Sequence, residues 1–280
     1  MPWYPDLFSA PLLQRIRDDA ADARAAEPVP YFDGVRSGET EALIGSFAGQ
    51  PELHHPVHGR VRGRRAFERF VTDANAWLFE RNALFGSVQR IRTPEREIEQ
   101  TVMQVDGDSG RVDVPVVVAA DRNDDGRITE LRVYFSMWPL TGEHHHRPPL
   151  LEPDPGLRAP DVIGEYQRAI AAGDARAAVA AFEPDAYIRE PAGSAWVHRG
   201  HDELSAVYER FFSNGGGVRQ ELCTVTDDGR ACALEYNLLR WGRTELSPEA
   251  GLAVYLRGSS GKLAGACIYD DADPPVAAAS

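Results

Sequence analysis

The feature that most constrains the fold is an internal repeat with a period of 135 residues. Segments 31–56 and 166–191 align without a gap and share tyrosine, glycine, phenylalanine and proline positions. The same offset returns near the end of each half, where Tyr134 corresponds to Tyr269. Such matches at one period are hard to obtain from an apolar pattern alone. The sequence therefore predicts a tandem duplication.

The length supports two domains of similar size. A chain of 280 residues has a prior of about two domains, and a half of about 135 residues can bury its own core. A stretch rich in Pro, Gly and His lies between the halves and is typical of a linker. We therefore predict a first domain over 1–143, including an amphipathic helix over 12–26, a linker over 144–160 and a second domain over 161–280.

Each half places helices first and a run of strands after them. Helices are expected over 31–47, 62–84, 166–182 (two in this range, broken at Gly173) and 202–212. Strands, bounded by turn signals, are expected over 52–58, 87–93, 98–105, 112–120, 128–138, 186–190, 218–226, 230–241, 252–257 and 263–269, with a loop over 192–200. This order predicts the α+β class: two tandem cone-like domains, each with helices packed on a curved, mainly antiparallel sheet. A cavity between helices and sheet is the natural place for a ligand.

Charge and cysteine usage restrict the partners and the compartment. A net charge of -13 repels phosphate, so nucleic acid and anionic membranes are not expected as partners. The N-terminal sequence lacks a basic region followed by an uninterrupted apolar core, so no signal peptide is expected, and no apolar run is long enough to span a bilayer. Cys223, Cys232 and Cys267 lack metal-ligand spacing and are interpreted as reduced core thiols. We therefore expect a cytoplasmic protein.

The second half also carries a recognisable motif. Its elements are Tyr166, 171–174, Phe182, 189–194 and Gly200. In this motif the second half resembles the ketosteroid isomerase and SnoaL-like branch of the nuclear transport factor 2-like superfamily, and the first half resembles it more weakly. The resemblance implies that Tyr166 donates a hydrogen bond to a developing oxyanion and that Glu190, just before a proline, moves the proton. The superfamily includes isomerases, cyclases, epoxide hydrolases, dehydratases and binding modules, so the motif indicates the fold more than one reaction.

The sequence departs from the isomerase pattern at one position and offers a second acid elsewhere. Ala253 stands where the isomerases carry a second, protonated carboxylic acid. Glu221 shares a strand face with Cys223 and Val225. Burying a carboxylate on an apolar face costs free energy, so such a residue either destabilises the fold or serves a function. A Glu190–Glu221 pair resembles the two acids of tandem-domain epoxide hydrolases that close polyether rings. Two acids in one apolar cavity would have their pKa values pushed apart, giving one acid and one base.

These candidates have structural alternatives that the sequence leaves open. Glu190 can be a strand-end carboxylate that pairs with a nearby arginine, and Tyr166 can be a core tyrosine with a satisfied hydroxyl. Glu221 can be a solvated strand residue. The remaining pocket candidates of the second half are Tyr236, Trp241 and Asp270, the last of which precedes an acidic, Pro-rich tail.

The first half carries its own candidates. His55 and Tyr31 stand at the positions of Glu190 and Tyr166. A histidine can act as a base because its unperturbed pKa is about 6.5. The alternative is a decayed site that is kept for packing, and the first half is the weaker candidate.

The histidines of the first half do not predict a metal site. His54, His55 and His58 lie close in sequence, but adjacent residues on a strand point to opposite faces, so two of these three side chains diverge. The run 144–146 in the linker is interpreted as a solvated connector. No metal ligands are expected.

Together these observations predict a cofactor-independent acid–base enzyme of small-molecule metabolism, acting on an apolar substrate such as a polyketide or terpenoid. No phosphate-binding loop, dinucleotide fingerprint or nucleophile elbow is present in the sequence. The reaction is isomerisation, ring closure or epoxide opening. The alternative is a small-molecule binding or scaffold protein that kept the cavity and lost turnover. The two domains are expected to pair as an intrachain pseudo-dimer.

Overall fold

The computed structural model describes residues 31–108, 110–191, 193 and 196–273. The chain divides into two compact units, one within residues 14–142 and the other largely within residues 143–280. We call their described parts, 31–142 and 143–273, the first and the second unit. The helix predicted over 12–26 lies outside the described residues.

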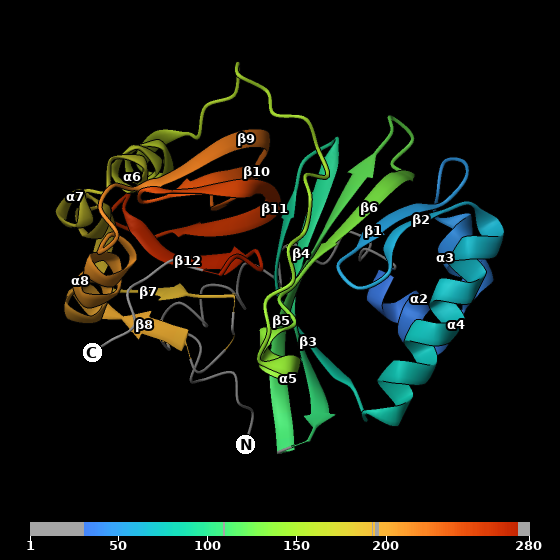
Figure 1. Ribbon diagram of the computed structural model, residues 1–280. Coiled ribbons are helices and arrows are strands. Elements are labelled where there is room, and N and C mark those ends of the chain that lie inside the picture. Colours follow the sequence, from blue (N-terminus) through green and yellow to red (C-terminus); the bar gives the residue numbers. More distant parts are fainter. Residues whose placement is uncertain (1–30, 109, 192, 194–195, 274–280) are drawn as a thin grey trace. The chain divides into compact units, whose positions relative to one another are not determined.

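The first unit packs helices on one face of a six-stranded sheet (Figure 1). Its helices are α2 (Tyr31–Ser37), α3 (Thr40–Gly45), α4 (Arg64–Glu80) and α5 (Trp138–Thr141). Its strands are β1 (Glu52–His55), β2 (Gly59–Arg62), β3 (Leu84–Arg92), β4 (Arg96–Gly107), β5 (Gly110–Arg122) and β6 (Ile128–Tyr134). The strand order is β2-β1-β6-β5-β4-β3, and every pairing is antiparallel except β1 with β6.

The second unit repeats this architecture. Its helices are α6 (Asp161–Ala172), α7 (Ala175–Ala180) and α8 (Gly200–Phe211). Its strands are β7 (Phe182–Arg189), β8 (Val197–Arg199), β9 (Val218–Asp227), β10 (Ala231–Trp241), β11 (Thr244–Arg257) and β12 (Leu263–Tyr269). The order is β8-β7-β12-β11-β10-β9, again with one parallel pairing, β7 with β12.

The two sheets therefore have the same strand order, as a tandem duplication requires. The bounds of α3 and α7, and those of β6 and β12, coincide after a shift of 135 residues. The predicted α+β class, with helices on a mainly antiparallel sheet in each half, is confirmed.

The turn between α6 and α7 forms from local signals in the sequence. Gly173 ends α6 in the left-handed region, at φ 71°, which favours a residue without a Cβ. The side chain of Asp174 then accepts a hydrogen bond of 2.9 Å from the backbone N–H of Ala177. This is the N-cap that the sequence predicts, and only Gly173 and Asp174 separate the two helices.

Several predicted elements differ from the structure. Strand β2 and helix α5 were not predicted, and the helix predicted over 62–84 spans only Arg64–Glu80. The segment predicted as a loop over 192–200 contains the edge strand β8, which is too short to show an alternating pattern. The helix after Asp174 ends at Ala180, and Phe182 already begins β7. Strand β11 starts at Thr244, well before the predicted start at Leu252, because polar residues on its exposed half conceal it.

The segment after Gly142 contains neither helix nor strand up to residue 160 and is tied to the second unit. The backbone N–H of Ala250 donates to the carbonyl of Arg147 at 2.9 Å, and that of Asp154 donates to Leu222 at 2.8 Å. His144 Nδ1 lies 3.1 Å from Asp271 Oδ1. The predicted linker thus runs along the second unit, while its limits at 144 and 160 stay a prediction.

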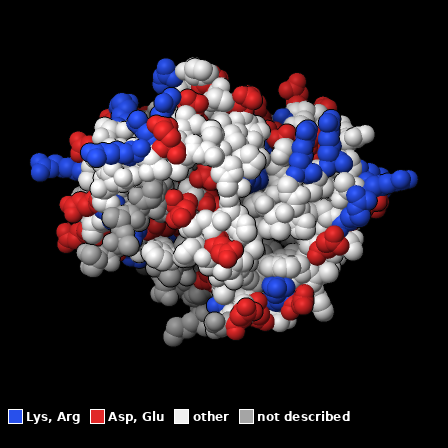
Figure 2. Space-filling model, in the orientation of Figure 1, with Lys and Arg blue, Asp and Glu red and all other residues white. Residues whose placement is uncertain are grey.

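Each unit has its own apolar core, as the length predicts. The three cysteines form no disulfide. None of the described helices is long and apolar enough to cross a membrane. On the face shown in Figure 2, basic and acidic side chains are interspersed and do not gather into one basic patch.

Candidate functional site

A cavity of about 330 Å³ lies inside the first unit. Protein sites for small organic ligands enclose about 300–1,000 Å³, so this cavity can hold such a molecule. Helices α2 and α4 supply one wall, and the sheet supplies the other. The lining is mostly apolar and consists of Tyr31, Phe32, Val35, His55, Val57, His58, Asp73, Ala74, Trp77, Leu78, Phe85, Met103, Val116, Val133, Phe135, Met137 and Leu140.

His55, at the end of β1, is held in this lining by aromatic rings and by the backbone. Its ring centroid lies 5.3 Å from that of Phe70 and 5.4 Å from that of Phe135. Its Nδ1 accepts hydrogen bonds from the backbone N–H groups of Val57, at 3.2 Å, and His58, at 3.4 Å. A ring nitrogen that accepts carries no proton, so the neutral imidazole holds its proton on Nε2. The backbone turn therefore assigns His55 the tautomer that donates through Nε2.

The other polar groups of the cavity are a phenol, a second imidazole and a carboxylate. Burial raises the pKa of Tyr31, so its hydroxyl stays protonated. The ring of His58 lies 5.0 Å from that of His55, centroid to centroid. His58 and Asp73 are exposed, so they contribute to the cavity from its solvent side. The structure thus brings the predicted residues Tyr31 and His55 into one ligand-sized cavity.

The corresponding space in the second unit is only about 60 Å³, which is room for a few water molecules. The Tyr208 hydroxyl donates to that of Tyr166 at 2.9 Å. The predicted residues Tyr166, Tyr236, Trp241 and Asp270 all belong to its lining, together with Ile170, Ile188, Tyr208, Phe211, Phe212, Val218, Gln220, Leu238, Tyr255 and Ile268. Aromatic side chains therefore fill the space in which a ligand would lie.

Asp270 is the carboxylate that meets these tyrosines. The Tyr236 hydroxyl donates to Asp270 Oδ2 at 2.7 Å. Burial raises the pKa of Asp270 to about 6, although the hydrogen bond from Tyr236 opposes the shift. A carboxyl with this pKa can give or take a proton near neutrality, but the space beside it is small.

Glu190 lies in an ion-pair cluster instead. Its Oε1 is 2.6 Å from His198 Nε2 and 2.9 Å from Arg210 Nη2. Glu190 follows the last residue of β7, so its side chain turns toward β8 and α8, while Ile188 faces the small cavity. Among the described residues, neither cavity lining includes Glu190, and the predicted pairing of this acid with Tyr166 is absent.

Glu221 pairs with an arginine on its own strand, β9. Its Oε1 is 3.4 Å from Arg219 Nη2, and its side chain is 40% exposed. Neither cavity lining in the described part of the chain includes it. The structure therefore does not bring together the two acids of the Glu190–Glu221 hypothesis.

The two cavity walls are copies of each other at the 135-residue offset. Equivalent lining pairs are Tyr31 and Tyr166, Val35 and Ile170, Trp77 and Phe212, Phe85 and Gln220, Met103 and Leu238, Val133 and Ile268, Asp73 and Tyr208, and Phe135 and Asp270. The last two pairs differ most in chemistry. Tyr208 places a ring in the second wall where the first has the smaller Asp73. The motif favoured the second half, whereas the ligand-sized cavity lies in the first. A signal for this in the sequence is that Tyr208, Tyr236 and Tyr255, which line the small space, correspond to the smaller Asp73, Thr101 and Ala120.

Glu249, on β11, is a buried acid that the sequence analysis did not single out. Burial, with Asp270 and Asp271 nearby, raises the pKa of Glu249 to about 7 from 4.5. Because the folded state holds this proton more tightly than the unfolded state, ionisation destabilises the fold as the pH rises from 4.5 through 7.

We expect Glu249→Gln to raise the free energy of unfolding by about 1–2 kcal/mol near pH 8, after allowance for solvent screening, and to change it little near pH 4. Urea unfolding at the two pH values measures the difference. An equal effect at both would contradict the assignment, and Glu245→Gln on the same strand is the control.

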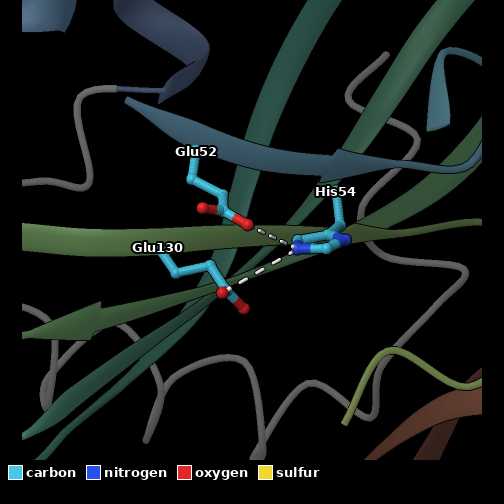
Figure 3. Close-up of side chains that lie close together, drawn as sticks. All are labelled: Glu52, His54 and Glu130. Carbon is cyan, nitrogen blue, oxygen red and sulfur yellow. Dashed lines mark ion pairs between the residues drawn. The ribbon is translucent and has the colours of Figure 1, made fainter. Parts of the chain in front are cut away.

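One further cluster lies on the other face of the first sheet (Figure 3). Glu52 and His54 project from β1, and Glu130 projects from the neighbouring β6. Burial alone would raise the pKa of Glu130, but hydrogen bonds from His54 and Arg132 lower it to about 2. As the sequence predicts for adjacent residues, His54 and His55 face opposite ways, since only His55 lines the cavity.

Comparison with known proteins identifies the class of domain. Residues 163–262 match the family model described as "SnoaL-like domain". The second unit is therefore a SnoaL-like domain of the nuclear transport factor 2-like fold, and the equal strand order of the two sheets indicates a tandem duplication of it. No curated protein matches the sequence.

Three of the similar solved structures each match less than half of the chain. A protein from Sinorhizobium meliloti described as a candidate polyketide cyclase is 21% identical, covers 39% of this chain and 94% of its own, and has a TM-score of 0.34. The epoxide hydrolase/cyclase-like enzyme SalBIII, described in pyran-ring formation in the polyether salinomycin, is 16% identical, covers 45% and 94%, and has a TM-score of 0.33. A protein from Sphaerobacter thermophilus is 20% identical, covers 42% and 100%, and has a TM-score of 0.34.

Proposed function

We propose that this protein is an acid–base enzyme that acts on an apolar small molecule in the cavity of the first unit. The observation that carries the proposal is the mostly apolar cavity of about 330 Å³ with His55 in its wall. Apolar walls with few polar groups suit a polyketide- or terpenoid-like substrate, whose one or two oxygens those groups would orient. The reaction is an isomerisation, a ring closure or an epoxide opening.

The tautomer of His55 defines its role in this reaction. With Nδ1 engaged by backbone N–H groups, the neutral ring donates through Nε2 to a carbonyl or epoxide oxygen on which negative charge develops. Tyr31, kept neutral by burial, is a second donor. His58 and Asp73, on the solvent side of the cavity, are the groups that can accept a proton from carbon or from a hydroxyl. From its sequence position His55 was considered as a base; the hydrogen bonds to Nδ1 favour it as a neutral hydrogen-bond donor to the developing oxyanion.

The second unit is assigned a supporting role in this proposal, because its cavity is too small for such a substrate. The catalytic roles predicted for Tyr166, Glu190 and Glu221 remain a competing proposal. Under that alternative Glu190→Gln abolishes turnover, whereas under ours it does not. Pairing of the two domains as an intrachain pseudo-dimer is part of our proposal and predicts a monomeric mass in solution.

Filling the cavity tests the site. We expect Val116→Phe, on the cavity face of β5, to weaken binding of cyclic enones and epoxides at least about 10-fold, because the added ring occupies part of the space. Quenching of the tryptophan fluorescence, to which Trp77 in the cavity lining contributes, measures binding, and chromatography of the products measures turnover. Val112→Phe, on the same strand but outside the lining, is the matched control. Equal binding by the two variants would place the ligand elsewhere.

A binding protein without turnover is the second candidate. The position of Glu190, in an ion-pair cluster and outside both linings, favours it, since the acid implied by the family motif is then not available for proton transfer. Ligand binding that Val116→Phe abolishes, without conversion of any bound enone or epoxide, would select this candidate.

A further inference from the structure

We propose that Glu52, His54 and Glu130 bind a divalent transition-metal ion such as Zn²⁺, on the sheet face opposite the cavity. Residues two apart on a strand share a face, which places Glu52 and His54 side by side on β1. The parallel register of β1 with β6, Leu53 opposite Leu131, brings Glu130 next to them. The site is thus built from two strands that lie far apart in sequence.

The spacing of the three donor atoms suits one ion. His54 Nε2 lies 3.5 Å from Glu52 Oε1 and 3.8 Å from Glu130 Oε2, and both carboxylates point toward the ring in Figure 3. The three donors all lie within 4.8 Å of one another. Tetrahedral bonds of about 2.0–2.2 Å place ligand atoms about 3.4 Å apart, so small side-chain shifts suffice. A nitrogen with two carboxylate oxygens is a donor set that Zn²⁺ accepts, with a water completing the tetrahedron.

The surroundings of Glu130 prepare it for this role. Arg132 Nη1 bonds Glu130 Oε1 at 2.7 Å, which leaves Oε2 directed toward His54. Arg132 is itself compensated by Asp121, whose Oδ2 lies 2.7 Å from it. Ligating carboxylates are commonly held by such outer hydrogen bonds.

Two arginines compete with the ion. Arg60 Nε donates to Glu52 Oε1 at 2.7 Å, and Arg62 Nε lies 3.3 Å from Glu52 Oε2. Their side chains are 56% and 63% exposed, so both can swing into water when an ion enters, and exposed ion pairs of this kind are weak. The competition gives the site a signature: removing the charge of Arg60 must strengthen metal binding.

The ion would fasten β1 to β6, the one parallel pairing of this sheet. Because β1 also carries His55, metal binding would fix the strand that presents this residue to the cavity. The metal is thus a structural clamp that stands apart from the proposed chemistry, and the inference does not depend on the proposed function.

Calorimetric titration of the full-length, tag-free protein with Zn²⁺ tests the site. We expect one ion per chain, binding at least about 10-fold weaker in His54→Ala and tighter in Arg60→Gln, with a Zn²⁺-dependent rise in Tm that His54→Ala abolishes. The double variant His145→Ala/His146→Ala controls for binding to the linker histidines. Unchanged affinity in His54→Ala, or loss of binding in the linker variant, would overturn the proposal. Because Arg60→Gln predicts a gain, misfolding of a variant cannot imitate it.

Discussion

Replacing His55 with alanine is expected to lower kcat of the proposed reaction by about 10²- to 10³-fold, the range that one hydrogen-bond donor to a developing oxyanion contributes. The loss follows from the removal of the Nε2 donor, which acts on charge that develops only in the transition state, so KM should change less than kcat. Steady-state kinetics measure both constants, on a cyclic enone or epoxide that binds in the fluorescence experiment. His55→Gln keeps a hydrogen-bond donor but in a different position, so its kcat should lie between those of the unmodified protein and His55→Ala.

Two variants serve as comparisons for this experiment. His145→Ala removes an exposed histidine of the segment after Gly142 and should leave kcat unchanged. Glu190→Gln separates the two units: full activity in it, with loss in His55→Ala, supports the site in the first unit. The reverse pattern would move the chemistry to the second unit.

Replacing Arg132 with methionine is expected to lower the free energy of unfolding by about 3–5 kcal/mol, the cost of removing one partner from a buried ion pair. The Arg132 side chain is 0% exposed, and its Nη1 lies 2.7 Å from both Asp121 Oδ2 and Glu130 Oε1. Methionine keeps much of the side-chain volume, so the loss reports two carboxylates left without their shared cation. Urea-induced unfolding followed by circular dichroism measures it.

The control is an ion pair in the same unit but at the surface. Arg111 Nη1 lies 2.7 Å from Asp106 Oδ1, with side chains 33% and 50% exposed. Water and salt screen this pair, so Arg111→Met should cost less than about 1 kcal/mol. Similar losses in the two variants would mean that burial does not increase the contribution of the Arg132 ion pairs to the free energy of unfolding.

The sequence was sufficient to predict the fold because the signals for helices and strands occur twice, once in each half of the chain. Gly173 and Asp174 mark a helix boundary by local chemistry, the left-handed end and the N-cap, which does not depend on tertiary contacts. The alternation that separates His54 from His55 is equally local, and the structure places them on opposite faces as predicted. The class, the helices-first order and most strands follow from such signals.

The site could be predicted only in part, because side-chain direction at a strand end depends on neighbours distant in sequence. Glu190 follows the last residue of β7, and it turns toward His198 of β8, a strand too short to be detected from the sequence. Cavity volume is harder still, since it depends on all the side chains that meet there. Tyr208, on α8, fills its space only because the helix brings it against Tyr166.

The equivalence of the two cavity walls has a consequence for how the chain can evolve. The position of Asp73 in one copy is that of Tyr208 in the other, and Phe135 corresponds to Asp270, so the ionisable groups now stand on different sides of two homologous interiors. In the first unit, the hollow copy, the cavity has room for a bulkier side chain, but that side chain takes up the space in which a ligand would bind. In the second unit, the filled copy, the same substitutions clash with close-packed aromatic rings and lower the free energy of unfolding. Natural selection would therefore detect changes at homologous positions through different losses, of activity in one copy and of folded protein in the other.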